Sequence, residues 1–250
     1  MFSLSSLGRR NRHAFLLMRG LKQMFRGMPE PELNLLGWLV DGERAAIDVG
    51  AHSGLYSQQL SKLATRVIAV EAIPELAVNL RRLLPQIEVV NAAASDSSGT
   101  LTLAIPDGKP GLSSVAHQQF DPDLTVRRIE IPCTTVDELV AARGPIGIGF
   151  IKIDVEGHEM AVLNGAKETI RAHRPTLLIE AEERHRPGTV AELLAFFEAL
   201  DYSGFYLDGQ LRALKSFNAA VHQSLEGVDI EAIDRGDYAG KYINNFIFIP

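Results

Sequence analysis

Residues 45–57 read AAIDVGAHSGLYS, in which a short apolar run passes directly into a turn with two glycines and then into a helical pattern. The run Ala45–Val49 has the length of a buried strand. Gly50 and Gly54 let the backbone turn sharply and approach a ligand without a Cβ in the way. The helix that follows offers free N–H groups at its N-terminus. This stretch therefore predicts the first strand, a binding turn and the first helix of an α/β domain.

The rest of the chain alternates short apolar runs with helical segments. The expected strands are 45–49, 66–70, 87–90, 150–155 and 176–181, and the expected helices are 54–64, 74–84, 159–172 and 189–200. Such alternation is typical of a doubly wound, mostly parallel sheet with helices on both faces. Ligands bind these sheets at the carboxyl ends of the strands, beside the point where the strand order reverses.

Two pairs of β-rich runs interrupt this alternation. They cover residues 100–105 with 126–132, and residues 204–207 with 245–249. The first pair flanks a glycine- and proline-rich loop with Ser113 and Ser114, and it predicts a hairpin-like insertion before the fourth strand. These two serines either face a substrate or serve the turn itself. In the second pair, Gly209 turns the chain.

The composition excludes several classes of protein. The chain has 250 residues, of which 46% are hydrophobic and 22% charged, so it is long enough for one large domain with a core of its own. No apolar run approaches the roughly 20 residues that a membrane-spanning helix needs. Cys133 is the single cysteine, which excludes an intrachain disulfide and a cysteine-cluster metal site. We therefore expect a reducing compartment, the cytoplasm.

Basic and acidic residues are distributed unevenly along the chain. Residues 1–29 hold six of the 25 Lys and Arg residues and none of the 31 Asp and Glu residues. Phosphate contacts need a basic face, so the acidic remainder argues against a nucleic-acid partner. Within residues 14–28 the apolar positions recur at helical spacing, and Arg19 interrupts the run that a secretory signal would need. We expect residues 1–44 to form a basic amphipathic helical arm.

The arm has two interpretations. Residues 12–28 either contact an anionic membrane surface or a partner, or they form a helix that packs on the domain with its charges in water. In the first case the protein is cytoplasmic but peripheral to the membrane.

The glycine turn has an acidic partner. Glu71 ends the second expected strand 21 residues after Gly50, where an acid can accept hydrogen bonds from both ribose hydroxyls. His52 stands where a dinucleotide fingerprint has its middle glycine. Asp48, just before the turn, disfavours a polyphosphate and favours a ligand with a cationic group. The order and spacing of the two features predict a nucleoside site.

Charged residues alternate along the fourth expected strand, at Lys152, Asp154 and Glu156. A central parallel strand is normally apolar, and unpaired buried charges cost several kcal/mol each. The three charges must therefore pair with one another or lie at the open end of the strand, where a ligand meets them. A structural Lys152–Asp154 ion pair is the alternative to a binding role.

Six segments together resemble the FkbM-type S-adenosylmethionine-dependent methyltransferases. They are IDVGAHSGLYS (47–57), VIAVEAIPE (67–75), NAAASDSSG (91–99), FIKIDVEGHEMAVLNGA (150–166), RPTLLIEAEE (174–183) and NNFIFIP (244–250). The resemblance covers residues 45–250. It implies a class I, Rossmann-like methyltransferase domain with a seven-stranded sheet whose last strand is antiparallel, and S-adenosylmethionine as the cofactor.

The resemblance also implies which residues bind the cofactor. Asp48, Gly50 and Gly54 match the motif that lies against the methionine part, and Glu71 matches the ribose-binding acid. Asn91 and Ala92 match the segment that passes the adenine, although the usual acid there is not evident. Asp154 matches the acid near the reacting end.

Methyl transfer to an alcohol needs a base near the acceptor oxygen, and the candidates are His158, Glu159 and Glu180, with Asp154 beside them. His158 has an intrinsic pKa near 6.5, but it can equally cap the next helix or bond a neighbour. Oxygen donors gather here too, and Mg²⁺ binds such groups. They are Asp154, Glu156, Glu180 and Glu182, with His185 nearby. Because no metal-specific spacing is present, we predict no metal ligand.

The sequence thus favours an O-methyltransferase that acts on a sugar, a glycan or another small molecule. Two alternatives remain open. One is a non-catalytic nucleoside-binding partner of a glycan-building complex. The other is a nicotinamide-dependent oxidoreductase, which the missing middle glycine disfavours. The residues that choose the acceptor cannot be identified from the sequence.

Overall fold

The computed structural model describes residues 30–108, 113–115, 125–224, 226 and 242–250. The expected helix at 14–28, and the surface contact expected of residues 12–28, lie outside this part of the chain. In the described part, no helix combines the length and the apolar character needed to cross a membrane.

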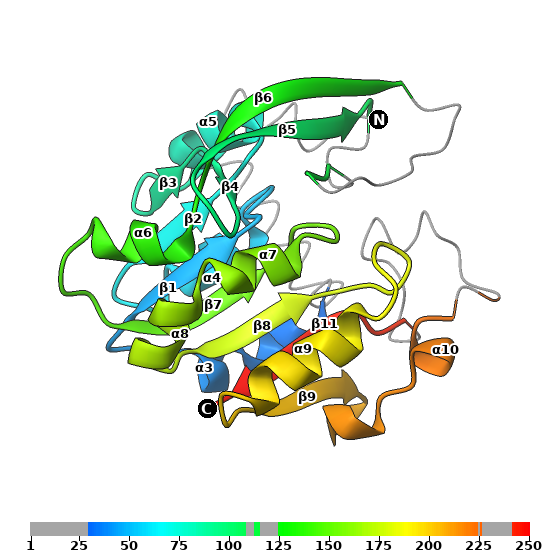
Figure 1. The fold of residues 1–250 in the computed structure, drawn as a ribbon. Coiled ribbons are helices and arrows are strands. Elements are labelled where there is room, and N and C mark those ends of the chain that lie inside the picture. Colours follow the sequence, from blue (N-terminus) through cyan, green and yellow to red (C-terminus); the bar gives the residue numbers. More distant parts are fainter. Residues whose placement is uncertain (1–29, 109–112, 116–124, 225, 227–241) are drawn as a thin grey trace, which may run out of the picture.

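The described residues form a central eight-stranded sheet with the strand order β10-β9-β11-β8-β7-β1-β2-β3 (Figure 1). Its strands are β1 (Ala45–Val49), β2 (Val67–Val70), β3 (Glu88–Val90), β7 (Ile148–Ile153), β8 (Thr176–Glu180), β9 (Ser203–Asp208), β10 (Gln210–Ala213) and β11 (Asn245–Ile249). The five strands from β3 to β8 pair in parallel, and β11 runs antiparallel to both β8 and β9. The predicted doubly wound, mostly parallel fold is confirmed.

One strand more is present than the seven that the resemblance implied. After Gly209 the chain folds back, and β10 pairs antiparallel with β9 as an edge hairpin. All four residues of β10 are exposed. The edge strand therefore carries no buried apolar alternation by which the sequence could have indicated it.

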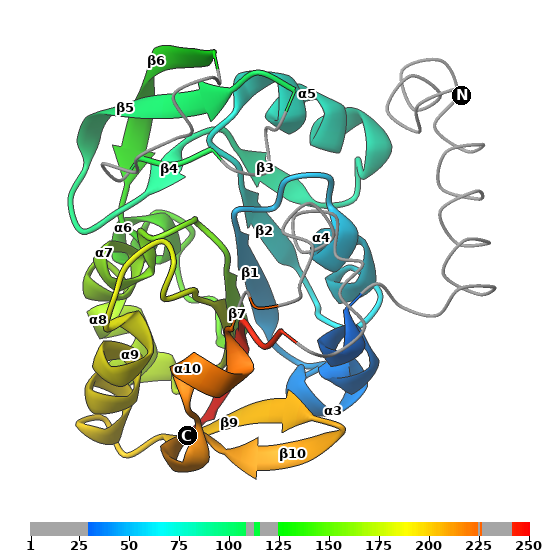
Figure 2. The same cartoon turned by 90° about the vertical axis from the view of Figure 1, so that its right-hand side faces the viewer.

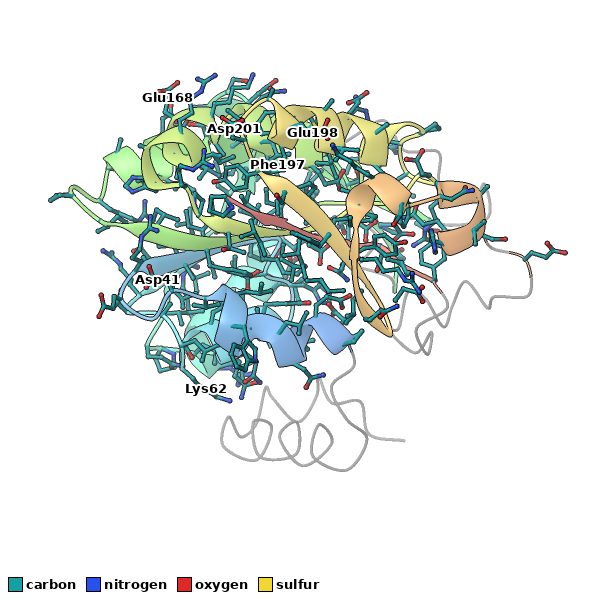
Figure 3. All side chains as sticks on the ribbon, turned by 90° about the horizontal axis from the view of Figure 1, so that it is seen from below. Asp41, Lys62, Glu168, Phe197, Glu198 and Asp201 are labelled. Atoms are coloured by element: carbon teal, nitrogen blue, oxygen red, sulfur yellow. The ribbon has the colours of Figure 1, made fainter. Side chains whose placement is uncertain are left out.

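Helices cover both faces of the sheet because the buried side chains of each strand alternate between two cores. One face packs on η1 (Pro31–Leu35), α3 (Leu36–Leu39), α4 (Leu55–Leu60) and α5 (Pro74–Leu83). The other packs on α6 (Val136–Ala141), α7 (Glu159–Asn164), α8 (Lys167–His173) and α9 (Thr189–Glu198). Figure 3 shows these layers above and below the strands, with Phe197 of α9 in the upper layer. Two short elements, η3 (Leu214–Ser216) and α10 (Ala219–His222), lie near the β9–β10 hairpin.

The helix expected at 159–172 is divided into α7 and α8 at Gly165. A Cβ on Gly165 would stand 2.0 Å from the carbonyl oxygen of Ser95. The glycine thus lets this turn touch the loop that contains Ser95, and the helix is interrupted there.

The β-rich insertion is confirmed as a separate small sheet. Its strands are β4 (Ala93–Ala94), β5 (Gly99–Pro106) and β6 (Val126–Thr134), in the order β4-β6-β5. β5 and β6 form the expected antiparallel pair. Leu103, Ile105 and Ile131 pack with Ile73 of the main domain. Figures 1 and 2 show this sheet at one end of the molecule, beside α5.

Residues 31–39 pack on the main domain, although the sequence assigned them to the arm. Leu33 and Leu36 are 5% and 1% exposed and belong to the same buried cluster as Tyr56, Leu60 and Phe150. The boundary after residue 44 stays a prediction, but the packing of η1 and α3 places part of the N-terminal segment against the sheet.

Candidate active site

Three neighbouring strands bring charged side chains to one face of the sheet at its carboxyl edge. Asp48 of β1 lies beside Lys152 of β7, which lies beside Leu178 of β8. Glu180 is two residues beyond Leu178 and shares its face, because side chains alternate along a strand. This edge includes the point between β1 and β7 where the strand order reverses, which is where such sheets bind ligands.

Lys152 is the centre of this group. Its Nζ lies 3.0 Å from Asp154 Oδ2 and 3.9 Å from Glu180 Oε2, and only 1% of the residue is exposed. The ring of Tyr56 lies under the ammonium, with its centroid 4.5 Å away. The expected Lys152–Asp154 ion pair exists, but it is one contact of a larger network.

The surrounding carboxylates keep Lys152 charged. Burial by itself would lower the pKa of this lysine, but the negative charges of Asp154, Glu180, Glu30 and Asp48 outweigh burial and raise it. The ammonium therefore remains positive throughout the physiological range.

Carboxyl groups outnumber this one ammonium. Burial raises the pKa of Asp48, which accepts a 2.5 Å hydrogen bond from the Ser57 hydroxyl. Burial also raises the pKa of Glu180 and of Glu156, and repulsion from Asp154 adds to both shifts. A cationic ligand would relieve this repulsion and favour the ionised carboxylates, so the site is complementary to a positive charge.

The glycine turn is in direct contact with the end of β7. Gly50 has φ +79°, and a Cβ there would stand 1.8 Å from the carbonyl oxygen of Asp154. Gly54 also has positive φ, but a Cβ on it would meet Leu80 of α5 at 2.6 Å. Gly50 thus joins the turn to the charged group, whereas the contact of Gly54 is with the core.

Glu71 lies beside the glycine turn, as the spacing predicted, and its binding of a ribose stays a prediction. Its carboxylate accepts hydrogen bonds from the backbone N–H of His52 (2.7 Å) and of Ile73 (2.8 Å). Burial raises the pKa of Glu71 to about 7, although the two N–H bonds lower it. Asn91 donates to the carbonyl oxygen of Glu71 at 2.8 Å, and the buried Ala92 follows it. The proposed nucleoside-binding residues are therefore adjacent.

The three catalytic candidates are not equivalent. Glu180 accepts a 2.6 Å hydrogen bond from Asn244 Nδ2 within the charged group. Glu159 is 2% exposed and accepts from Gly157 N–H at 2.7 Å, and burial raises its pKa to about 7. His158 lies at the start of α7 with Nε2 2.9 Å from Ser95 Oγ, and burial lowers its pKa. Glu159 and Glu180 border a hollow at the ends of β7 and β8, and His158 does not.

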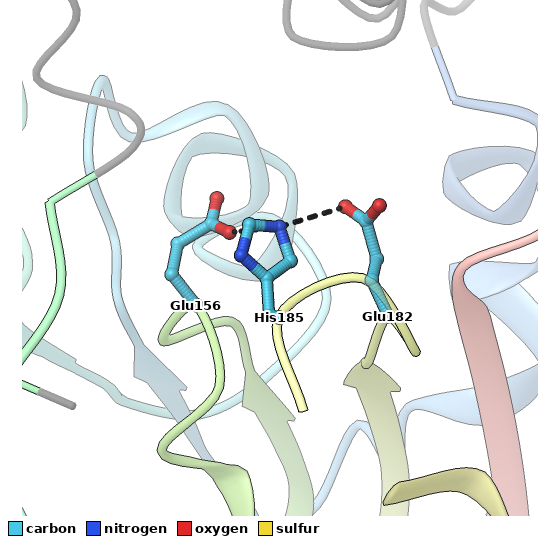
Figure 4. Close-up of side chains that lie close together, drawn as sticks. All are labelled: Glu156, Glu182 and His185. Atoms are coloured by element: carbon cyan, nitrogen blue, oxygen red, sulfur yellow. Dashed lines mark ion pairs between the residues drawn. The ribbon is translucent and has the colours of Figure 1, made fainter. Parts of the chain in front are cut away.

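Glu156, Glu182 and His185 also line this hollow, and Figure 4 shows their side chains close together. His185 Nε2 lies 3.0 Å from Glu156 Oε2 and 3.7 Å from Glu182 Oε1. The three ligand atoms lie within 4.8 Å of one another, so this trio could hold a metal ion. The prediction of no metal ligand stays a prediction.

Other groups already engage the Glu182 carboxylate. Arg184 Nε donates to it at 2.5 Å and the Tyr242 hydroxyl at 2.6 Å. Although burial by itself raises the pKa of Glu182, the bonds from His185, Arg184 and Tyr242 hold it at about 2. Glu182 is therefore an ionised anchor for the loop after β8.

Ser114 connects the insertion to the site. Its hydroxyl donates to the carbonyl oxygen of Glu156 at 2.8 Å, and its backbone pairs with Ala104 of β5. Glu156 has φ +49° and Gly157 φ +89°, so the chain leaves the β7 direction there. The strand consequently ends at Ile153, two residues earlier than expected. The Ser114 contact holds this turn.

Sequence reasoning missed two residues of the charged group. The Tyr56 hydroxyl donates to Glu30 Oε2 at 2.6 Å, and Glu30 is among the charges that act on Lys152. Tyr56 follows the glycine turn and could have been considered there. Glu30 lies outside every motif, so no local signal indicated it.

These features together define a class of protein. The strand order, the glycine turn after β1 and the acid after β2 are those of a class I methyltransferase domain, with a β insertion between β3 and β7.

Comparison with known proteins identifies the family. The Methyltransferase FkbM domain family matches residues 48–203. The chain belongs to this family, whose methyl donor is S-adenosylmethionine.

Two relatives illustrate the range of the match. The crystal structure of methyltransferase FkbM from Methylobacillus flagellatus KT superposes with a TM-score of 0.54 at 18% identity, over 98% of this chain and 57% of that one. The AMB antimetabolite synthetase AmbE of Pseudomonas aeruginosa is 23% identical over 207 residues, which cover 68% of this chain and 10% of that protein. The chain therefore spans a small part of the curated relative and little more than half of the structural one.

Proposed function

We propose that this chain transfers the methyl group of S-adenosylmethionine to a hydroxyl oxygen of a sugar, a glycan or another small molecule. The observation that carries the proposal is the surplus of buried carboxyl groups around Lys152, next to a glycine turn whose backbone touches Asp154. The cofactor is a sulfonium that supplies an electrophilic methyl group when bound.

The residues fit this cofactor. Gly50 has no side chain where the turn meets Asp154, and the Glu71 carboxylate is buried beside the same turn. Asp48 and Asp154 would supply negative charge for the positively charged groups of the methionine part. We propose that the cofactor is bound by the residues that match the family's motifs, which are Asp48, Gly50, Gly54, Glu71, Asn91, Ala92 and Asp154.

Enzymes accelerate such displacements mainly by holding the reactants in line. In the proposed reaction the residues of the site would hold the acceptor hydroxyl in line with the methyl group that the cofactor would supply. The hydroxyl proton passes to a carboxylate. Glu180 suits this role because burial and Asp154 raise its pKa, and Asn244 fixes the orientation of its carboxylate. Glu159 and His158 are the other candidates for the base.

Titration calorimetry tests the cofactor. Wild-type protein should bind S-adenosylmethionine and S-adenosylhomocysteine and not NADH, and Asp154→Asn should weaken S-adenosylmethionine binding at least tenfold. Glu43→Gln removes a charge from an exposed residue and is the matched control. Binding of NADH alone would overturn the proposal.

A panel of acceptors tests the reaction. Release of S-adenosylhomocysteine with polyols or sugars, and not with matched amines, is the expected result. Methylation of the amines alone would contradict O-methylation. Cofactor binding without turnover on any acceptor would favour the non-catalytic alternative.

A further inference from the structure

The N-terminal segment reaches the charged group through one residue. Glu30 precedes η1 and lies 18 residues before the first residue that matches the family. Its Oε2 accepts a hydrogen bond from the Tyr56 hydroxyl at 2.6 Å. Leu33 and Leu36, on the elements that follow, are buried against the sheet and hold the segment in place. Glu30 is therefore held by the hydrogen bond from Tyr56 and by the packing of the residues that follow it.

Tyr56 carries this contact to Lys152. The tyrosine is 5% exposed and stands in the first turn of α4, directly behind the glycine turn. Its ring centroid lies 4.5 Å from Lys152 Nζ, which is close enough for a cation–π contact. Lys152 in turn binds Asp154 and Glu180. One aromatic ring thus separates Glu30 from the lysine that holds both acids.

Charge makes the same connection. Ionised Glu30 is one of the carboxylates that raise the pKa of Lys152 and of Glu180. Burial raises the pKa of Glu30 itself, whereas the charge of Lys152 and the hydrogen bond from Tyr56 lower it and favour the ionised form. The other charged groups that act on Glu180 are Asp154, Lys152 and Glu156. Tyr56 on α4 and Asn244 before β11 are its uncharged polar neighbours. Glu30 therefore contributes to the negative field at the carboxyl ends of β7 and β8.

We propose that Glu30 is a positioning residue of the active site. It acts through Tyr56 on Lys152, and through Lys152 on Asp154 and Glu180. The segment from Glu30 to Leu39 is then part of the catalytic unit, outside the region that defines the family. This inference rests on the proposed function, because it assigns Glu30 to the same cofactor site.

The test compares a cationic ligand with its uncharged-sulfur counterpart. Glu30→Gln keeps the size of the side chain and an oxygen that can accept from Tyr56, but it removes the charge. We expect the dissociation constant for S-adenosylmethionine to rise about fivefold, and that for S-adenosylhomocysteine to stay within about twofold, because the site loses one negative charge and only S-adenosylmethionine carries a positively charged sulfur. Glu43→Gln makes the same charge change at an exposed position and should alter neither constant.

A merely structural role predicts a different pattern. If Glu30 only anchors the segment, Glu30→Gln weakens both ligands equally or neither, and either result overturns the inference. Tyr56→Phe removes the hydroxyl that donates to Glu30. It should likewise weaken the binding of S-adenosylmethionine more than that of S-adenosylhomocysteine. The variant with both changes should then lose little more affinity for S-adenosylmethionine than either single variant, because both residues act on one path. Additive losses would contradict the path through Tyr56.

The two proposals fail in distinguishable ways. If the wild-type protein binds neither ligand, the proposed function is wrong. If the wild-type protein binds both and Glu30→Gln binds them with unchanged affinity, the assignment of the cofactor site stands and the role of Glu30 is refuted.

Discussion

Gly50 and Asp154 are in backbone contact across two neighbouring strands: a Cβ on Gly50 would stand 1.8 Å from the carbonyl oxygen of Asp154. The Asp154 N–H donates to the carbonyl oxygen of Val49 at 3.0 Å, so a hydrogen bond joins the two chain segments next to this contact. The first turn and the fourth-strand acid are therefore one structural unit. Displacement of either one must move the other.

Gly50→Ala should disrupt the contact between the glycine turn and Asp154. A positive φ costs a residue with a Cβ about 1–2 kcal/mol, and here a backbone carbonyl also occupies the position of the new methyl group. We expect the free energy of unfolding to fall by about 3 kcal/mol or more, with a tenfold or greater loss of S-adenosylmethionine affinity. Urea unfolding and titration calorimetry measure the two effects.

Gly37 provides the matched control. It lies in α3, and nothing stands within 4 Å of the position that its Cβ would take. Gly37→Ala should leave cofactor binding unchanged and stabilise the protein by about 0.5–1 kcal/mol. Equal stability of the Gly50 and Gly37 variants would show that the contact with Asp154 can relax.

Glu159 should make the stability of the protein fall as the pH rises from about 4.5 to about 7. Burial raises the pKa of this carboxyl group from 4.5 to about 7. A raised pKa means that the folded protein holds the proton more tightly, so the stabilising contribution is complete below pH 4.5 and is lost by about pH 7. The shift corresponds to about 3 kcal/mol.

Glu159→Gln removes this dependence while an amide oxygen can still accept from Gly157. Near pH 5 the variant and the wild type should have similar free energies of unfolding, and at pH 8 the variant should be the more stable one. The exposed Glu43→Gln should show a difference from wild type that does not change with pH. Parallel curves for Glu159→Gln and wild type would mean that Glu159 is not desolvated as the structure describes.

Local pattern was sufficient to predict most of the fold. Buried strands such as Ala45–Val49 are continuous apolar runs, and the spacing of Gly50 and Glu71 reflects the return of a parallel strand to the same edge. Contacts between segments that are far apart in the sequence leave no such run or spacing by which to predict them. The contact of Glu30 with Tyr56 depends on how η1 packs, and β10 is an exposed edge strand.

The candidate site was predictable to the same extent. Asp154 and Glu180 were expected to lie together because each lies at the end of a parallel strand, and the sequence also allowed an ion pair between Lys152 and Asp154. The structure adds the contact of the same lysine with Glu180. The orientation of a side chain in a loop does not follow from its position in the sequence. His158 is next to Glu159 in the chain, but its ring is directed to Ser95.

The contact between His158 and Ser95 can be measured. A double-mutant cycle with His158→Ala and Ser95→Ala should give a coupling free energy of about 1 kcal/mol, the net contribution of one hydrogen bond. We expect the two single variants to lose similar, small amounts of methyl transfer. A loss of 100-fold or more in His158→Ala alone would identify His158 as the base.

Lys152 offers the sharpest test of the charge arrangement. Lys152→Met keeps much of the apolar stem but leaves Asp154 and Glu180 without the cation between them. Removal of one partner of a buried ion pair typically costs 3–5 kcal/mol, because the remaining charge is buried without compensation. Urea unfolding at pH 8 should show a loss of this size. The loss should shrink near pH 5, because the orphaned carboxyl groups can take up protons and become neutral.

Asp154→Asn, added to Lys152→Met, should recover part of the loss by removing one of the two unpaired charges. If the double variant is as unstable as Lys152→Met, the lysine stabilises the fold by packing over the Tyr56 ring, and the balance of charge is not what holds the site together.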